Sequence, residues 1–389
     1  MKKLFGGIAV AVVLLCGAMW VAGVAAHRAF DPRPWPANLG LLADAPAHFP
    51  DVETNPAAQA LTELTPPLGF SITPKLPALQ QPKVGNDWEA IKEPVNKYFH
   101  DELERTNEQI APPPANVAAY LNDHRAQIDR ARDHILNAGP IVWVTHFRMG
   151  ADAPLPNLLG QMNLSKLLAA RALMKANAGD ATAWDDLHAI WLLDRELWQR
   201  PELISQLIAL AGARMVNASA AKMPLPAPQW LAEIQSFDYR QHFAASHQAE
   251  AYFMTHEWRK EPGRFKALQS LYFEVAASSA AEKMRSRTKE MMETSNCDLS
   301  AVAPMQPDSW NFLEKMALPN FIPAWQRLYR FRAELEATRN ALAIRSGQRP
   351  ATASACADGT WAVTASSAVF SRELAVPSQS VKYPLAYRR

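Results

Sequence analysis

The fold is decided by residues 158–222, which are LLGQMNLSKLLAARALMKANAGDATAWDDLHAIWLLDRELWQRPELISQLIALAGARMVNASAAK. Apolar residues recur in this stretch at the spacing of an α-helix. Gly179 is placed to end one helix and Pro201 to begin another, because glycine favours helix C-termini and proline is tolerated in the first turn. Connections this short force successive helices to pack as antiparallel neighbours. The three predicted helices span residues 158–177, 181–199 and 201–222.

The remaining sequence has a similar helical pattern, interrupted by proline-rich connections. It contains 15 glycines and 30 prolines, whereas folds built from strands and turns usually need more glycine. A hydrophobic content of 49% and a charged content of 20% suit a folded chain with a sizeable core. We therefore predict a mainly α fold, an antiparallel helical bundle or array of about seven helices. Further helices are expected at about 88–108, from 117 onward, at 239–259, within 265–292 and from 323 to 347.

Two segments flank the predicted α-helical domain, which spans residues 86–348. Residues 27–85 are rich in proline and lack sustained periodicity, so we expect a membrane-proximal stalk. One short helix should interrupt this stalk, because Asn55 can cap a helix that has proline in its first turn. Residues 349–389 are expected to form a small C-terminal β-hairpin and an irregular tail, with strands near 361–364 and 368–370.

The N-terminal segment predicts where the protein is located. Residues 4–26 contain no charged side chain and follow two lysines, a pattern that favours a membrane-spanning helix with a cytoplasmic N-terminus. We therefore expect residues 1–26 to anchor the chain in the lipid bilayer of a bacterial inner membrane, with the remainder in the periplasm. The alternative is a secretory signal cleaved near Ala26, since Val24-Ala25-Ala26 supplies the small residues of a cleavage site.

The cysteines are consistent with an oxidising compartment. Cys16 is expected to be a small apolar residue within the membrane helix. The two cysteines that follow this segment, Cys297 and Cys356, can pair only with each other within one chain. A disulfide between them is a candidate, and its formation depends on whether their Cα atoms approach within about 7 Å.

The strongest candidate for chemistry is a set of residues on the predicted helix 239–259. His247, Glu250, Met254 and Glu257 recur at intervals of three and four, so they lie on one helix face. Metal sites in helical bundles usually take such pairs from facing helices, and no second helix offers a matching pair. We therefore predict no metal site and no cofactor. We favour a polar stripe that pairs with arginines.

Charged residues also interrupt apolar stripes on other predicted helices. Arg332 and Arg339 do so on the last long helix, and Asp194 does so between two tryptophans. Because burying a charge without a partner costs several kcal/mol, ion pairs between helices are the favoured interpretation. The functional alternative is that Arg332 or Arg339 joins His247 and Glu250 at a catalytic or ligand-binding cleft.

Tryptophan is abundant in the chain, with 12 residues. Exposed rings could stack on sugars of the cell wall. However, Trp184, Trp191 and Trp198 recur every seven residues on one predicted helix, which is typical of a packing seam. We therefore expect these three rings to lie in the core.

Charge and motif content exclude several function classes. The formal net charge is only +2 and no basic run occurs, so we expect no nucleic-acid partner. The sequence lacks the Gly-x-Ser-x-Gly elbow, the His-Glu-x-x-His motif and a phosphate-binding glycine loop. These features favour a protein that binds other molecules without transforming them.

The order of segments resembles an uncharacterised group of bacterial membrane-anchored, helical envelope proteins. The resemblance rests on Asn55-Pro56-Ala57-Ala58, on residues 200–208 (RPELISQLI) and on residues 316–321 (MALPNF), and it implies no particular activity. We therefore expect a non-catalytic scaffold or adaptor that binds an envelope protein partner. The alternative is an envelope hydrolase or a small-ligand-binding protein that uses the His247 and Glu250 face.

Overall fold

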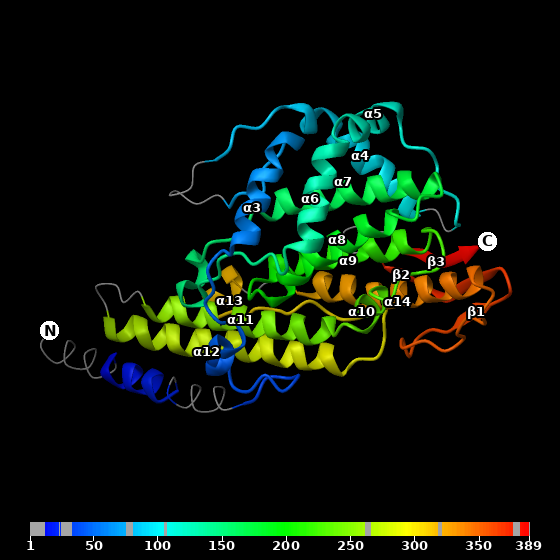
Figure 1. Cartoon of the computed structure of the whole chain (residues 1–389). Coiled ribbons are helices and arrows are strands. Elements are labelled where there is room, and N and C mark those ends of the chain that lie inside the picture. The colour runs from blue at the N-terminus through cyan, green and yellow to red at the C-terminus, as the bar shows by residue number, and fades with distance from the viewer. Residues whose placement is uncertain are drawn as a thin grey trace, which may run out of the picture.

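The computed structural model describes residues 12–22, 24, 33–74, 81–104, 107–260, 266–317, 321–375 and 382–388. It is mainly helical, as predicted, with 62% helix and a small antiparallel sheet near the C-terminus (Figure 1). Its described part contains 13 α-helices, more than the predicted seven. One reason is that the helix predicted from residue 117 is interrupted at His124, whose backbone leaves the helical conformation.

The helices and strands have the following bounds. The α-helices of the N-terminal half are α2 (Ala45–His48), α3 (Pro56–Leu64), α4 (Asp87–Glu104), α5 (Ala115–Asp123), α6 (Arg125–Asn137), α7 (Leu158–Asn177) and α8 (Ala183–Arg195). Those that follow are α9 (Leu203–Ala220), α10 (Leu231–Ser236), α11 (Tyr239–Lys260), α12 (Lys266–Glu293), α13 (Phe312–Ala317) and α14 (Ile322–Arg345). The strands are β1 (Trp361–Val363), β2 (Ser367–Ala375) and β3 (Lys382–Arg388), and four 3-10 helices are η1 (Leu42–Asp44), η2 (Pro66–Leu68), η3 (Phe147–Asp152) and η4 (Glu196–Gln199).

The three central helices confirm the prediction made from residues 158–222. Helices α7, α8 and α9 are consecutive neighbours in contact, and η4 extends the end of α8. Figure 1 shows α4–α7 on one side of the α8 and α9 pair and α11 with α12 on the other. Trp184, Trp191 and Trp198 are all buried, so the seven-residue repeat is a packing seam as predicted.

The proline-rich segment differs from the predicted stalk because it belongs to the core. Trp35, Phe49, Leu61 and Phe70 are buried in the same apolar cluster as the central helices. Helix α3 packs on α6, while η1 and α2 pack on α11. The predicted cap of α3 is present, with the Asn55 side chain accepting the Ala58 N–H at 2.9 Å. Proline content alone suggested a free segment, but enough apolar side chains are present to bury it.

The C-terminal sheet contains the predicted hairpin and one further strand. The strand order is β1-β2-β3 with antiparallel pairing, and Trp361 lies opposite Phe370. Strand β3 lies within what the sequence indicated to be an irregular tail. The sheet packs on α14 through β2 and β3. Glu336 of α14 also binds the segment before the sheet, because its carboxylate accepts the indole N–H of Trp361 at 2.8 Å and the backbone N–H of Ala355 at 2.7 Å.

One helix of the described residues, α9, is long and apolar enough to cross a membrane, and 61% of it lies buried inside the structure. Its neighbours are α7, α8, α11 and α14. Packing in the core therefore accounts for its apolar composition. The predicted anchor, residues 4–26, is described only at residues 12–22 and 24, where Val12–Ala22 forms an apolar helix.

Candidate functional site

His247 lies in a closed aromatic environment. Its side chain is fully buried, and its ring centroid lies 4.0 Å from that of Phe321 and 5.3 Å from that of Trp325. Its Nδ1 atom is 3.1 Å from the Thr288 hydroxyl, and its Nε2 atom has no hydrogen-bond partner. Burial lowers the pKa of His247 to about 3, so the ring is neutral at physiological pH. The His247 ring is therefore not accessible to a ligand, which argues against the alternative in which it is catalytic.

Glu250 performs a structural task at another helix. Its carboxylate accepts the backbone N–H of Leu203 at 2.9 Å, at the N-terminus of α9. This terminus is otherwise without a side-chain cap from its own N-cap residue. Burial raises the pKa of Glu250, and the hydrogen bond from Leu203 acts in the opposite direction. His247 and Glu250 share a helix but have different partners, so they do not form one site.

The two arginines predicted to join them do not converge on the site either. Arg339 is exposed to solvent, whereas Arg332 is partly buried and its Nη1 atom has no hydrogen-bond partner. Most of the circumference of α14 is buried, including Ala333, Glu336 and Asn340. The apolar stripe inferred from the sequence is therefore only part of the buried surface of this helix. The prediction that Arg332 and Arg339 lie within a buried apolar stripe was wrong for Arg339, which is exposed.

Ion pairs between helices exist, but at other residues. The Arg214 guanidinium of α9 binds both carboxylate oxygens of Glu334 on α14, at 2.7 and 2.6 Å. Arg330 donates to the same carboxylate at 2.8 Å, and these two cations lower the pKa of Glu334 against the effect of burial. The predicted type of interaction is therefore present, whereas its assignment to Arg332, Arg339 and Asp194 was wrong.

Asp194 is a buried carboxyl group without a counter-ion. It is 1% exposed, its Oδ2 atom has no hydrogen-bond partner, and no ion pair to it occurs in the described part of the chain. The group lies against Gly212 of α9, where a Cβ atom would come within 1.4 Å of Oδ2. Burial raises the pKa of Asp194 well above its ordinary value. Burial therefore favours the protonated over the ionised form of this carboxyl group.

Replacing Asp194 with asparagine should stabilise the protein at pH 7 relative to the wild type. An unfolded aspartate releases its proton near pH 3.9, whereas the folded chain retains it, so wild-type stability falls as the pH rises above that value. Asparagine does not titrate, so the advantage of Asp194→Asn should shrink towards pH 4. Urea unfolding at pH 4 and pH 7 measures this, with the exposed Asp123→Asn as control. An equal difference at both pH values would contradict the assignment.

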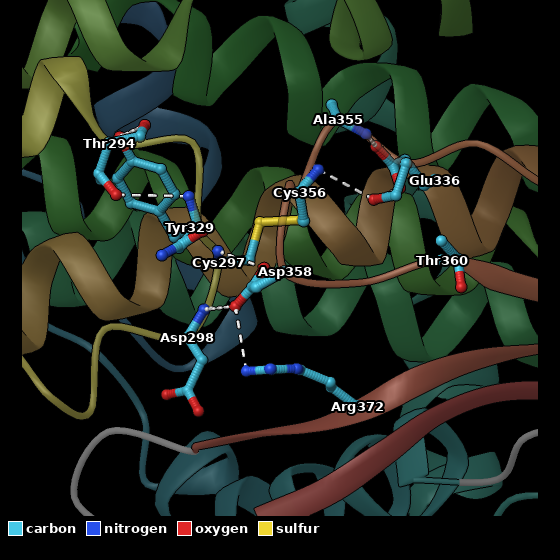
Figure 2. The surroundings of a disulfide bond; sticks show 12 residues. Thr294, Cys297, Asp298, Tyr329, Glu336, Ala355, Cys356, Asp358, Thr360 and Arg372 are labelled. Carbon is cyan, nitrogen blue, oxygen red and sulfur yellow. Dashed lines mark hydrogen bonds and ion pairs between the residues drawn. A yellow bond between two sulfur atoms is a disulfide. The ribbon is translucent and has the colours of Figure 1, made fainter.

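Cys297 and Cys356 form a disulfide, with Cα atoms 5.3 Å apart. Figure 2 shows Asp358 beside it, with its carboxylate accepting the backbone N–H groups of Cys297 and Asp298, each at 3.0 Å. The donor atoms of both cysteines and Asp358 lie within 4.8 Å of one another. Because the two sulfurs are bonded to each other, they are not available as thiolate metal ligands. The disulfide covalently links the segment that follows α12 to the C-terminal segment.

A surface pocket of about 1020 Å³ lies between the N-terminal segment and the segment that connects α6 to α7. Its apolar wall includes Pro66, Trp143 and Met149. The carboxylates that line it are those of Glu53, Glu63 and Asp152, and all three residues are exposed. Among the described residues, the lining includes neither lysine nor arginine, and its one further ionisable side chain is that of His146, whose Nε2 atom is 3.7 Å from Glu53.

Arg200 holds the backbone of the pocket wall in place through hydrogen bonds. This buried guanidinium donates to the carbonyl oxygens of Val144 and Pro154, at 2.9 and 3.2 Å. It also forms a two-pronged ion pair with Glu202, at 3.0 and 2.9 Å. Reciprocal backbone hydrogen bonds of 2.9 Å join Val52 to Thr145 across the two segments. The pocket is therefore a preformed feature of the fold.

Trp143 lines the pocket and carries an unused hydrogen-bond donor. Its side chain is 3% exposed, and its buried indole N–H has no hydrogen-bond partner among the described residues. Buried donors are usually satisfied, so each exception calls for an explanation. Sequence reasoning missed this site because its walls are about 90 residues apart in the chain and carry no motif. The one local signal is a charged pair of residues, Arg200 and Glu202, at a helix boundary.

No protein family, curated protein or solved structure matches the chain.

Proposed function

We propose that the chain is a membrane-anchored extracytoplasmic adaptor in a bacterial envelope, with the pocket lined by residues from 53–74, by Pro82 and by residues from 143–154 as its binding site. The pocket is the observation that supports binding most directly, because it is large, open to solvent and held in shape by the buried Arg200. Its partner on this proposal is another envelope protein.

The disulfide supports a location outside the cytoplasm. Disulfides form and persist in oxidising compartments and are rare where thioredoxin and glutathione keep thiols reduced. Both cysteines are buried, and their backbone is organised by hydrogen bonds from Cys297 and Asp298 to Asp358. The pairing is thus integrated into the fold, which favours a permanent structural bond.

The helix Val12–Ala22 supports the anchor. Most of its side chains are exposed, with Val13, Leu14 and Leu15 exposed by 69%, 68% and 65%. Several neighbouring exposed apolar side chains are unfavourable in water but favourable in hydrocarbon. Insertion in the inner membrane by residues 4–26 is consistent with this exposure.

The positions of the predicted catalytic candidates favour an adaptor over a hydrolase. His247 is neutral and enclosed by aromatic rings, Glu250 caps α9, and Arg339 faces solvent on a different helix. A general base must come within hydrogen-bond reach of its substrate, and the buried His247 does not meet this condition. The positions of these residues therefore give no support to the hydrolase alternative that uses His247 and Glu250.

Cross-linking in whole cells, followed by detergent extraction and capture through a tag after Arg389, tests the proposal. We expect a specific envelope protein to be recovered with the full chain. The matched control has residues 1–26 replaced by a cleavable secretory signal, which exports the same body without an anchor. Loss of the partner from this control would support an adaptor that acts at the membrane.

Recovery of the full chain alone after cross-linking would contradict the adaptor proposal. Location is tested separately by alkylating free thiols before lysis and again after reduction. Cys297 and Cys356 should be labelled only after reduction, and labelling before it would contradict an oxidising compartment.

A further inference from the structure

We infer that the pocket binds a basic peptide segment of the partner, in which a lysine or arginine adjoins apolar residues. This inference rests on the proposed adaptor function and names the chemistry of its ligand. It is carried by the charge of the pocket rim, the apolar wall and the unused donor of Trp143.

The charge of the rim selects a cation. Glu53, Glu63 and Asp152 contribute three carboxylates, and no lysine or arginine occurs among the described residues of the pocket lining. The side chain of Glu53 is 82% exposed, and its carboxylate lies 3.7 Å from the Nε2 atom of His146. Carboxylates of one sign around an apolar recess attract a positive ligand and repel a negative one. An acidic or phosphorylated ligand is therefore disfavoured at this position.

The wall of the pocket requires an apolar ligand surface beside the cation. Pro66, Trp143, Val144 and Met149 line it, and Met149 is 46% exposed. A bare metal ion would leave the exposed surface of Met149 in water, whereas the stem of a lysine or arginine and its apolar neighbours would cover it. Aromatic rings and methionine are also the side chains that recur at peptide-binding surfaces.

A peptide can also satisfy the donor that the protein leaves unused. The indole N–H of Trp143 is buried and has no partner in the part of the chain that the structure describes. A peptide carbonyl oxygen could accept it after a small adjustment of the pocket wall, because peptides present one such acceptor at every residue. The volume of about 1020 Å³ accommodates several residues of an extended segment rather than a single side chain.

Fluorescence anisotropy with the full chain in non-ionic detergent tests this inference. The probe is a fluorescein-labelled seven-residue peptide with two lysines flanking two leucines, and its comparison peptide has glutamates in place of the lysines. We expect the lysine peptide to bind at least about 10-fold more tightly than the glutamate peptide. Its affinity should fall with rising salt, because exposed charge pairs are screened.

Neutralising the rim identifies the site. The variant Glu53→Gln, Glu63→Gln, Asp152→Asn should bind the lysine peptide about 10-fold more weakly, because it removes all three rim carboxylates together. The control Asp123→Asn, Glu293→Gln, Glu373→Gln changes the net charge equally at exposed positions that do not line the pocket and should bind like the wild type. The single variant Glu63→Lys provides a second test if the triple variant does not fold.

Equal affinities for the two peptides, or equal losses in the rim and control variants, would overturn the inference. The inference would also be overturned if a neutral peptide bound in the pocket with an affinity that does not change with salt concentration. These outcomes are independent of the cross-linking result, because a partner can be captured through another surface. Conversely, salt-dependent peptide binding without a captured partner would uphold the ligand chemistry and contradict the adaptor function.

Discussion

Replacing Arg171 with methionine is expected to lower the free energy of unfolding by about 3–5 kcal/mol, because it removes the main counter-ion of the buried Asp186 carboxylate. Arg171 is 2% exposed and joins three helices. Its Nε atom donates to Asp186 of α8 at 3.0 Å, and its Nη1 atom donates to Asp129 of α6 at 2.8 Å. A further bond from Nη2 completes a two-pronged contact with Asp186. Lys175 remains as a weaker partner of Asp186 at 3.0 Å.

Two matched variants separate the loss of this ion pair from the loss of charge in general. Lys97→Met removes the exposed pair with Asp101, which is 2.8 Å long, and should cost about 0–1 kcal/mol. The double variant Arg171→Met, Asp186→Leu removes both members of the buried pair and should recover part of the stability. Urea unfolding followed by tryptophan fluorescence measures all three. A loss below 1 kcal/mol for Arg171→Met would show that water enters and replaces the guanidinium.

The network of Arg171 illustrates why local signals predicted the centre of the fold but not its electrostatics. Helices α7, α8 and α9 follow from the spacing of apolar residues, a glycine terminator and short connections, all of which act over a few residues. Whether Arg171 pairs with Asp129 depends on how α6 packs against the central helices. The two residues are 42 positions apart in the chain. Helical periodicity alone therefore identified charged residues on apolar faces without identifying their partners.

The N-terminal segment was mispredicted for a related reason. Trp35, Phe49 and Phe70 are separated by prolines at irregular intervals, so they give no periodic signal. Their burial comes from contacts with distant helices, such as the Gln248 side-chain amide of α11, which donates to the carbonyl oxygen of Leu39 at 3.1 Å. Tertiary packing can cover an irregular segment whenever its backbone groups find such partners.

The candidate site was missed because a pocket is a property of the assembled fold. Glu53 and Asp152 belong to connecting segments that sequence analysis left without structure, and neither has a motif around it. In contrast, His247 and Glu250 drew attention because their spacing is regular. Their regular spacing reflects two structural tasks on α11, packing against Trp325 and capping α9.

Opening the Cys297–Cys356 disulfide is expected to lower the free energy of unfolding by up to about 4 kcal/mol. The two cysteines are 59 residues apart, and the loop-closure entropy that a cross-link of this length removes from the unfolded chain corresponds to about that value. Asp358 should preserve the local structure after reduction, because its bonds to the Cys297 and Asp298 N–H groups do not require the disulfide. The loss should therefore arise mainly in the unfolded state.

Urea unfolding with and without dithiothreitol measures this effect, with free thiols counted by alkylation. In the Cys297→Ala, Cys356→Ala variant, dithiothreitol should have no effect, and its stability should approach that of the reduced wild type. Cys16→Ala is the matched control, since this residue is a free cysteine and lies outside the disulfide. An unchanged unfolding midpoint in a chain with both thiols reduced would mean that the unfolded state remains compact between residues 297 and 356. In that case, the bond would contribute little to stability, and its value to the protein would lie in holding the C-terminal sheet beside α14.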